Sequence, residues 1–335
     1  MAVPGLLSQL VARRGATFTL LAATLLGPRP TAAAAAYSEV VPLAGAATET
    51  ADDAAPGHHD GPGWTRNQLG ITLATVSVHA AFAVWTWAIW YRKLTPSDEF
   101  LIRREGWFGA DTYAGGADKL GHFLGNYALT RGTSQLLEAA GLRPVPRLLL
   151  ANGLTFFSYL MIELKDGKHA RFGFSPEDMV ANLTGNLVAT AFELWPALDD
   201  ALDLRLHYVP SDAYVQRVTG DEANVGEDYS GMRFELLLKG AFFVPPPRQT
   251  PPALHALRYL MVGVGYATRG YKPVLEPNPL RQLSVVVALD VQTLLDELLY
   301  DRLPGRGRRL MRFATEHIAL PYTTVEPLSV AIPPR

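Results

Sequence analysis

Acidic, amide and imidazole side chains recur at helical spacing between residues 117 and 185. Asp118 and His122 are four positions apart, and so are Asp178 and Asn182. Side chains four positions apart lie on one face of an α-helix. Both pairs belong to the pattern Asp-x-x-x-(His/Asn)-x-x-Gly-Asn. The repeat fits either an ancient duplication of a helix pair or two helix faces that meet the same packing demand.

These residue types can bind a metal ion or transfer protons. Imidazole nitrogen and carboxylate oxygen suit zinc or another divalent ion, so the candidate metal ligands are His122, Glu163, Asp166 and Asp178. Alternatively, His122, Asp118, Asp178 and Glu163 are the catalytic residues of an acid–base centre. The cofactor is therefore left open between none and a divalent metal ion.

Substrate-binding residues are expected beside this set. Lys119 and Arg171 carry the charge needed to hold a phosphate or carboxylate group. Asn182 offers an amide one helical turn after Asp178. We expect these three side chains to contact the substrate if the site is functional.

Each polar residue also has a structural explanation. Asp178 stands three positions after Ser175, where a capping-box acid belongs. Asp166 precedes a glycine, which is a turn signal. His122 could be a satisfied core histidine, and Asn182 could bond a neighbouring helix. The functional interpretation rests on the convergence of these residues rather than on any one of them.

The predicted elements bring the residues together. An antiparallel bundle with short connections places the start of the second helix, the end of the third and the start of the fourth at one end. No His-Glu-x-x-His, phosphate-loop or Gly-x-Ser-x-Gly pattern occurs in the chain. Helices are predicted at 69–91, 117–140, 145–164 and 176–195.

The motifs resemble those of two protein families. Asp-Lys-x-x-His at 118–122, acids near 163–166, and Arg171 followed by Ser-x-x-Asp-x-x-x-Asn-x-x-Gly at 175–185 resemble the VanZ-like family. The set is closer still to the YfiM-like family of uncharacterised envelope proteins, often labelled predicted periplasmic lipoproteins. The similarity covers about 107–195, and stretches at 228–231 and 264–266 resemble the downstream half of longer YfiM-like proteins. The resemblance implies a helical core and a site rather than an activity.

The amino-acid composition limits the classes of partner and the kinds of membrane anchor that the protein could have. The 335 residues carry a net charge of −2 with 19% charged residues, so a nucleic-acid partner, which requires a basic excess, is not expected. Hydrophobic residues make up 48% and the mean hydropathy is +0.08. The sequence contains no cysteine, which excludes disulfides, Cys-ligated zinc and a lipid-modified cysteine within it. A membrane anchor would therefore be a helix.

The N-terminal third predicts export and membrane association. Arg13 and Arg14, an apolar run and an alanine-rich stretch indicate a signal peptide over 1–36, and 37–68 has the composition of a disordered linker. The range 69–91 holds no charged residue and is long enough to cross a bilayer. The basic residues that follow predict that its C-terminal end lies in the cytoplasm. A buried helix of a soluble bundle is the alternative.

The remaining chain predicts a different architecture. Short runs at 234–239, 258–267 and 283–291 have the β-branched and aromatic composition of strands. We therefore expect a mainly α protein, α+β overall, in which a membrane-associated four-helix VanZ-like bundle (69–200) precedes a small antiparallel β region (201–335).

Two classes of function are compatible with this organisation. One is a hydrolase or transferase of the inner membrane that acts on a lipid-linked envelope substrate, with its C-terminal region exported to the periplasm. The other is a non-catalytic envelope protein that contacts membrane lipids or a partner and whose polar cluster is a helix-packing network.

Overall fold

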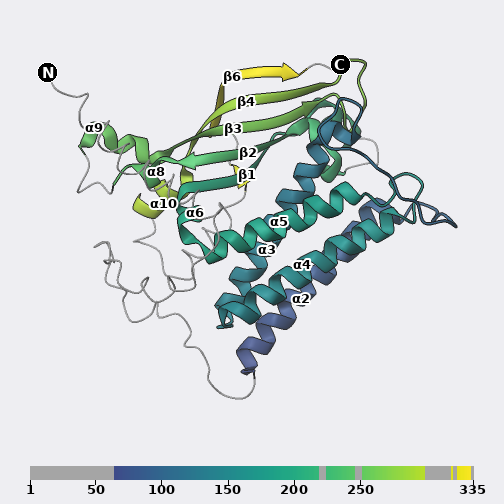
Figure 1. Cartoon of the computed structure of the whole chain (residues 1–335), viewed down its shortest axis with the longest axis horizontal. Coiled ribbons are helices and arrows are strands. Elements are labelled where there is room, and N and C mark those ends of the chain that lie inside the picture. Colours follow the sequence, from purple (N-terminus) through teal and green to yellow (C-terminus); the bar gives the residue numbers. More distant parts are fainter. Residues whose placement is uncertain (1–63, 219–223, 246–250, 299–317, 320–322, 333–335) are drawn as a thin grey trace, which may run out of the picture. The chain divides into compact units, whose positions relative to one another are not determined.

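The protein has an α+β architecture, as the sequence predicts. The structure, a computed structural model, describes residues 64–218, 224–245, 251–298, 318–319 and 323–332 (Figure 1). The predicted signal peptide and nearly all of the predicted linker lie outside these residues. Long helices come first in the described chain, and the strands follow them.

Four helices of 19 to 23 residues form a bundle, and their bounds lie close to those expected. The first begins with a capping box formed by Thr65 and Gln68, and the last ends directly before Pro196. A π-helical segment, η3 (Trp87–Tyr91), extends the first helix. The helices are α2 (Arg66–Thr86), α3 (Ala117–Ala139), α4 (Pro144–Asp166) and α5 (Pro176–Leu194) (Figure 1).

Short helical segments connect the larger elements. They are η4 (Tyr113–Gly116), α6 (Pro196–Ala201), α7 (Asp212–Val218), η5 (Val225–Glu227), η6 (Tyr229–Gly231), α8 (Gly240–Phe243), α9 (Pro252–His255), η8 (Ala256–Tyr259) and α10 (Val291–Leu298).

The β region is one six-stranded sheet, which is larger than expected. Its order is β5-β1-β2-β3-β4-β6. All neighbours are antiparallel except β1 and β5, which are parallel. The predicted strands correspond to β2, β3 and β4, whereas β1, β5 and β6 were not expected. The strands are β1 (Leu202–Tyr208), β2 (Met232–Lys239), β3 (Leu260–Arg269), β4 (Leu280–Leu289), β5 (Ile318–Ala319) and β6 (Thr324–Ile332).

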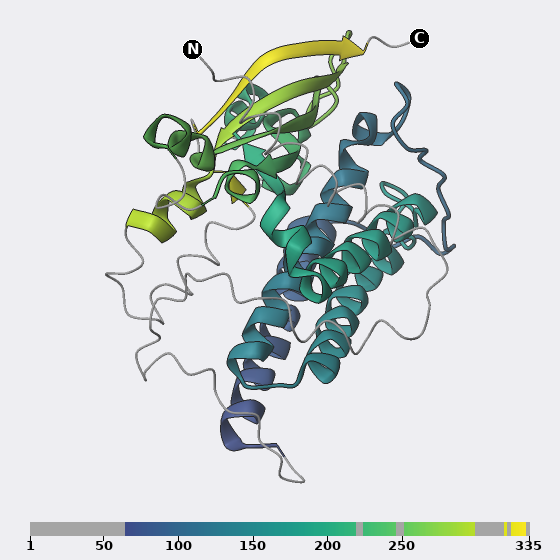
Figure 2. The same cartoon turned by 60° about the vertical axis from the view of Figure 1, so that its left-hand side comes forward.

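The N-terminal half of α3 joins the bundle to the sheet. Leu124 and Tyr127 pack with Phe234 in the largest hydrophobic cluster, to which β1 and α5 also contribute. Figures 1 and 2 show the sheet on one side of the four helices. The Tyr229 hydroxyl of η6 donates to Asp118 at the start of α3, and the Tyr266 hydroxyl of β3 donates to the Gly115 carbonyl. The β region therefore meets the bundle at the end where α3 begins.

The bundle buries polar side chains and exposes apolar ones. In α2 the four buried residues are Thr72, Thr75, His79 and Thr86. The two His79 ring nitrogens lie 2.9 Å from the hydroxyls of Ser158 and Thr133, which satisfies both. The exposed side of α2 is apolar and includes Leu69, Leu73, Val76, Val78, Val84 and Trp85.

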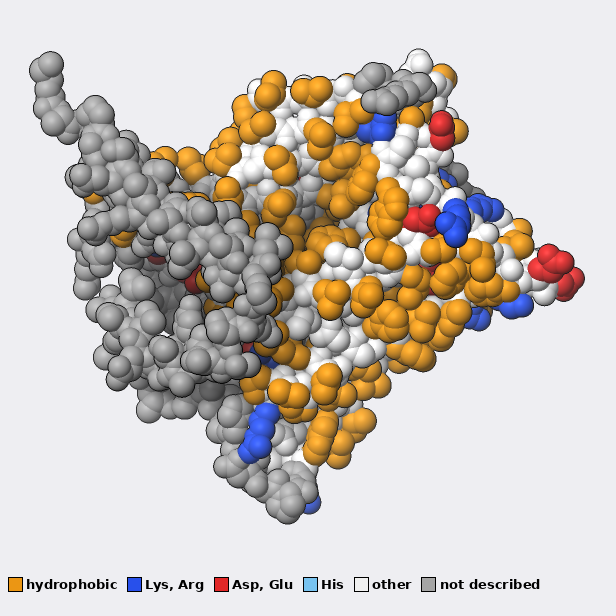
Figure 3. Space-filling model, in the orientation of Figure 1, with side chains coloured by type: hydrophobic (Ala, Val, Ile, Leu, Met, Phe, Trp, Pro, Cys, Tyr) orange, Lys and Arg blue, Asp and Glu red, His pale blue; other side chains and the backbone are white. Residues whose placement is uncertain are grey.

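The sheet shows the same inverted pattern. On β2 the side chains of Arg233 and Glu235 are buried, whereas Leu236 and Leu238 are exposed. Figure 3 shows hydrophobic side chains over the sheet and the long helices on this face. Among the described helices, the 66–91 segment and α4 are long and apolar enough to cross a membrane, a test that core helices of soluble proteins also pass.

Candidate functional site

Lys119 is the centre of a buried ionic cluster at the start of α3. Its side chain is only 1% exposed, and its Nζ lies 2.9 Å from Asp118 Oδ2 and 2.6 Å from Asp178 Oδ1. It also pairs with Glu105. Burial lowers the Lys119 pKa, but the surrounding carboxylates raise it further, so the net shift is upward. Lys119 is thus a charged counter-ion, and this placement does not support the substrate-binding role expected for it.

His122 lies next to this ion cluster and is held by an amide. Its Nδ1 lies 3.0 Å from Asn182 Oδ1 and 3.4 Å from Glu163 Oε1. Asn126 donates to the same Asn182 oxygen, while Asn182 Nδ2 faces Glu163 at 3.5 Å. The network therefore assigns Asn182 Oδ1 as an acceptor and places a proton on Nδ1 of His122. That leaves Nε2, 3.8 Å from Asp118 Oδ1, as the atom available for chemistry.

The glycines of the repeated pattern explain how these helices approach so closely. A Cβ on Gly185 would lie 2.2 Å from the Phe123 carbonyl oxygen of α3. A Cβ on Gly125 would lie 2.1 Å from the Tyr159 hydroxyl of α4. Gly185 therefore permits a backbone contact between α3 and α5 that a larger residue would prevent, whereas the neighbour of Gly125 is the movable end of a side chain. The two copies of the pattern place His122 against Asn182.

Asp178 does not complete the capping box that its position suggests. Ser175 Oγ accepts a hydrogen bond from the Asp178 backbone at 3.2 Å, so Ser175 is the N-cap. The Ser175 backbone N–H, however, donates to Glu163 Oε2 at 3.4 Å. The Asp178 carboxylate is directed to Lys119 instead. The Asp178 side chain therefore takes part in the ionic cluster and does not cap the N-terminus of its own helix.

Asp118, His122 and Asp178 form a candidate metal-binding triad. One ligand atom from each lies within 4.8 Å of the other two. Burial lowers the His122 pKa, but the Asp178, Asp118 and Glu163 carboxylates raise it to about 9. Burial raises the Asp178 pKa to about 6. Burial also raises the Asp118 pKa, but His122 and Lys119 lower it more, so it falls below its usual range.

The cluster contains more acids than bases. Glu105, Asp118, Glu163 and Asp178 supply four carboxyl groups, whereas Lys119 and His122 supply two basic groups. Burial raises the Glu105 pKa even though Lys119 opposes that shift. A buried excess of carboxylates is costly unless protons or a cation balance it. The arrangement therefore attracts positive charge.

The structure does not bring every predicted site residue to this place. The Asp166 carboxylate accepts a hydrogen bond from Tyr91 at 2.7 Å and is not part of the triad. Arg171 is 50% exposed and pairs with Glu227 at 3.3 Å. His122, Asp118, Asp178, Glu163, Lys119 and Asn182 do lie together.

Three members of the cluster were missed from sequence. Glu105 directly follows two arginines, so from the sequence it looks like part of a basic segment rather than a member of the site. Tyr229 reaches Asp118 across 111 positions of the chain. Asn126 is the last residue of the first copy of the repeated pattern. Its match to Asn186 in the second copy could have identified it. Tyr229 had a weaker signal, since residues 228–231 belong to the stretch that resembles longer YfiM-like proteins.

One comparison with known proteins gives a match. Residues 104–193 match the family described as "Predicted periplasmic lipoprotein (DUF2279)". No curated protein and no solved structure matches the chain significantly. The matched segment contains α3, α4, all of α5 except its last residue, and every residue of the ionic cluster except Tyr229. The match supports placing the protein in the cell envelope. The ionic cluster lies inside the matched segment.

Proposed function

We propose that this is a membrane-associated envelope protein whose apolar exterior contacts lipid. The observation that carries this proposal is the inverted burial: α2 buries threonines and a histidine and exposes leucine, valine and tryptophan. In water such a surface would be strongly unfavourable, whereas a hydrocarbon environment favours it. The 66–91 segment and α4 have the length and composition that this setting requires.

The contacts of the β region bear on the topology. Four complete crossings would leave the β region on the side opposite the C-terminal end of α2. Yet Gly226 approaches Trp90 at the end of α2, and Tyr271 donates to the Ala110 carbonyl in the loop that follows. We therefore propose that this loop and the β region face the same, exported side. This proposal differs from the cytoplasmic placement of the loop that the basic residues predict.

The absence of cysteine makes this topology directly testable. Asp98→Cys lies in the exposed loop after α2, and Asp212→Cys lies on the exposed surface of α7. A membrane-impermeant maleimide applied to intact cells, with the outer membrane permeabilised, should label both variants. Labelling of Asp212→Cys alone would restore the expected topology and reject ours. Lysed cells provide the control for reactivity.

We further propose that the ionic cluster is a cation-dependent acid–base centre that acts on a lipid-linked substrate. Asp118, His122 and Asp178 would hold a divalent ion, which supplies a Lewis acid and lowers the pKa of water. Asn182 fixes the His122 ring by accepting from Nδ1, as an outer hydrogen bond does for many metal-ligating histidines. Glu163 lies 3.4 Å from the same Nδ1, where its carboxylate would stabilise the proton on that nitrogen.

Two features connect this centre to a substrate. His122 is 16% exposed, more than Lys119, Asp118 or Asp178. Arg171 lies on the exposed surface near η5, where it could bind a phosphate of a lipid headgroup. Lys119 holds the acids in place but does not reach the substrate. The proposed class is therefore a hydrolase or transferase for a phosphate-containing lipid-linked substrate.

A second candidate function is a purely structural network. The observation that favours it is the pairing of Lys119 with three carboxylates, which satisfies much of the buried charge without a metal ion. In this case the protein would be a non-catalytic envelope component, and its sheet would contact a partner or the membrane interface.

Conservative substitutions separate the two candidates. His122→Gln and Asp178→Asn preserve size and polarity, and Glu193→Gln is a matched control in which another buried acid of the bundle is neutralised. If the cluster is a cation-dependent centre, His122→Gln and Asp178→Asn should no longer bind stoichiometric zinc and should fail to complement a deletion strain. Their abundance and melting temperature should remain normal. The Glu193→Gln control should retain zinc binding and complementation even though it lowers the melting temperature. If His122→Gln and Asp178→Asn fail to accumulate, the network is structural and the catalytic proposal is rejected.

A further inference from the structure

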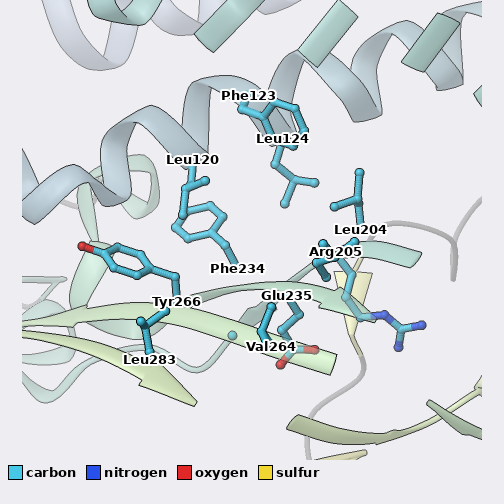
Figure 4. A pocket seen from close by; sticks show the side chains of 12 residues that line it. Leu120, Phe123, Leu124, Leu204, Arg205, Phe234, Glu235, Val264, Tyr266 and Leu283 are labelled. Carbon is cyan, nitrogen blue, oxygen red and sulfur yellow. The ribbon is translucent and has the colours of Figure 1, made fainter. Parts of the chain in front are cut away.

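A cleft lies between the first turns of α3 and the sheet. Leu120 and Leu124 project from the helix toward the strands, and the Phe123 ring lies beside the helix at the edge of the cleft (Figure 4). Phe234 and Val264 line the facing side. The cleft has a volume of about 170 Å³. For comparison, an engineered protein cavity of about 150 Å³ stays dry and admits benzene.

The walls of the cleft offer almost nothing to a polar ligand. Arg205 and Glu235 contribute to its floor, but Figure 4 shows their charged groups directed away from it. On the other face of the sheet Arg205 pairs with Asp203, and Glu235 lies 2.7 Å from Arg233. The remaining lining is aliphatic, aromatic or glycine. An occupant should therefore be a hydrocarbon without charged or hydrogen-bonding groups.

The cleft opens onto a continuous apolar surface. Leu236, Val264 and Leu283 line it and are also exposed at its mouth. Cross-strand pairing extends this face, because Leu283 is opposite Val330 on the edge strand. Contiguous apolar surface of this extent is unusual on a soluble monomer. The exposed apolar residues on this face of the sheet include Leu236, Leu238, Val262, Val264, Leu283, Val285, Leu328 and Val330.

We infer that this cleft binds one acyl chain of a membrane lipid. The apolar face of the sheet rests in the hydrocarbon, and a chain from that layer enters between α3 and β1–β4. The volume accommodates a segment of the chain, while the rest lies along the exposed strands. The inference rests on the membrane association proposed above, but it is independent of the cation site.

Photochemical labelling tests the inference. The full chain is reconstituted in vesicles of phosphatidylcholine and phosphatidylglycerol that carry a small fraction of phosphatidylcholine with a diazirine at the chain end. After irradiation, mass spectrometry should find adducts on peptides with the cleft-lining residues Phe123, Leu124 or Phe234, and on those with the exposed strand residues. Flotation of the vesicles measures membrane association separately.

A matched pair of variants distinguishes the cleft from the open surface. Val264→Trp places a large ring at the mouth, whereas Val262→Trp places the same ring two residues away on the same strand and face, outside the cleft. The two positions are similarly exposed, at 54% and 49%. Val264→Trp should reduce labelling of Phe123 and Leu124 several-fold, while Val262→Trp should leave it unchanged. Circular dichroism and flotation check that both variants fold and bind.

The outcomes separate the two proposals. Vesicle flotation with adducts only on the exposed strand residues would overturn the cleft and leave membrane association intact. Equal loss of cleft labelling in both variants would also overturn the cleft, because the effect would not be specific to its mouth. Failure to float, with no adducts on the sheet, would overturn both proposals.

Discussion

Two ionic clusters occupy opposite ends of α3, and they differ in charge balance. The Lys119 cluster (Glu105, Asp118, Lys119, His122, Glu163, Asp178) has four acids and two bases. The Arg131 cluster (Arg131, Glu138, Arg147, Glu193, Asp199) has a single buried acid between two arginines. The other two acids of the second cluster face solvent.

The geometry of the Arg131 cluster is that of a closed network. Glu193 lies 3.2 Å from Arg147 and 3.5 Å from Arg131, and it accepts a hydrogen bond from Ser134. Glu138 and Asp199 complete the pairs of the two arginines from the surface. Guanidinium groups hold their charge at all accessible pH values and cannot ligate a metal ion. This cluster can pack helices but cannot exchange a cation.

The Lys119 cluster has features that metal binding and proton transfer require and that the Arg131 cluster lacks. It has a histidine with one nitrogen fixed and the other available, and it has carboxylates beyond those that Lys119 neutralises. The comparison teaches that burial and ion pairing alone do not mark a functional site. An uncompensated charge beside a group that titrates is the more informative signal.

Removal of Lys119 should have the largest effect on stability. Lys119→Met leaves Glu105, Asp118 and Asp178 buried without their counter-ion, which should cost about 3–5 kcal/mol of unfolding free energy. Denaturant unfolding of the purified chain in detergent measures this. The exposed Lys168→Met should change the free energy by less than about 0.5 kcal/mol. Similar values for the two variants would show that Lys119 is not the counter-ion.

Loss of Glu193 should have a smaller effect that does not depend on metal. Glu193→Gln removes a charge-assisted acceptor from two arginines, with an expected cost of about 1.5–3 kcal/mol. The cost should be the same with zinc and with a chelator, because the Arg131 cluster has no ligand set. Glu138→Gln, at a residue facing solvent, should cost at most about 1 kcal/mol. A zinc-dependent cost at Glu193 would remove the distinction between the clusters.

The metal-free Lys119 cluster should also show a pH dependence that comes from His122. The His122 pKa is raised from 6.5 to about 9 in the folded protein. Its stabilising contribution is therefore complete below pH 6.5 and is lost as the pH rises through about 9. Over that window a chelated sample should lose at least about 1 kcal/mol of stability. His122→Gln should reduce this loss, and an unchanged loss would assign it to the buried carboxyl groups instead.

The sequence predicted the helices well because local signals specify them. Long apolar periods, the Ser175 cap and the prolines at 144, 176 and 196 act within a few residues. The charged strand β1 was missed even though alternation of apolar and polar residues is itself a local strand signal. Leu202–Tyr208 alternates perfectly, but its Asp203 and Arg205 are buried rather than exposed. The burial of Asp203 and Arg205 depends on the pairing of strands across the sheet, and the local sequence does not predict it.

Strand β6 and the complete cluster were missed for related reasons. Pro327 lies in β6, but this is an edge strand whose register with β4 shifts near that point, so it tolerates proline. Helix polarity predicted that His122, Glu163 and Asp178 approach one another. It could not predict Tyr229 or Glu105, which reach the cluster through tertiary contacts of the β region and of the loop after α2.

The most direct test of the central claim is to locate zinc in crystals of the full chain by anomalous diffraction. We predict one peak, about 2.0–2.2 Å from His122 Nε2 and from one carboxylate oxygen each of Asp118 and Asp178. No peak should lie at the Arg131 cluster, which has no free ligand set. Absence of a peak at His122 in crystals that contain zinc elsewhere would contradict the account and leave the Lys119 cluster as a packing network.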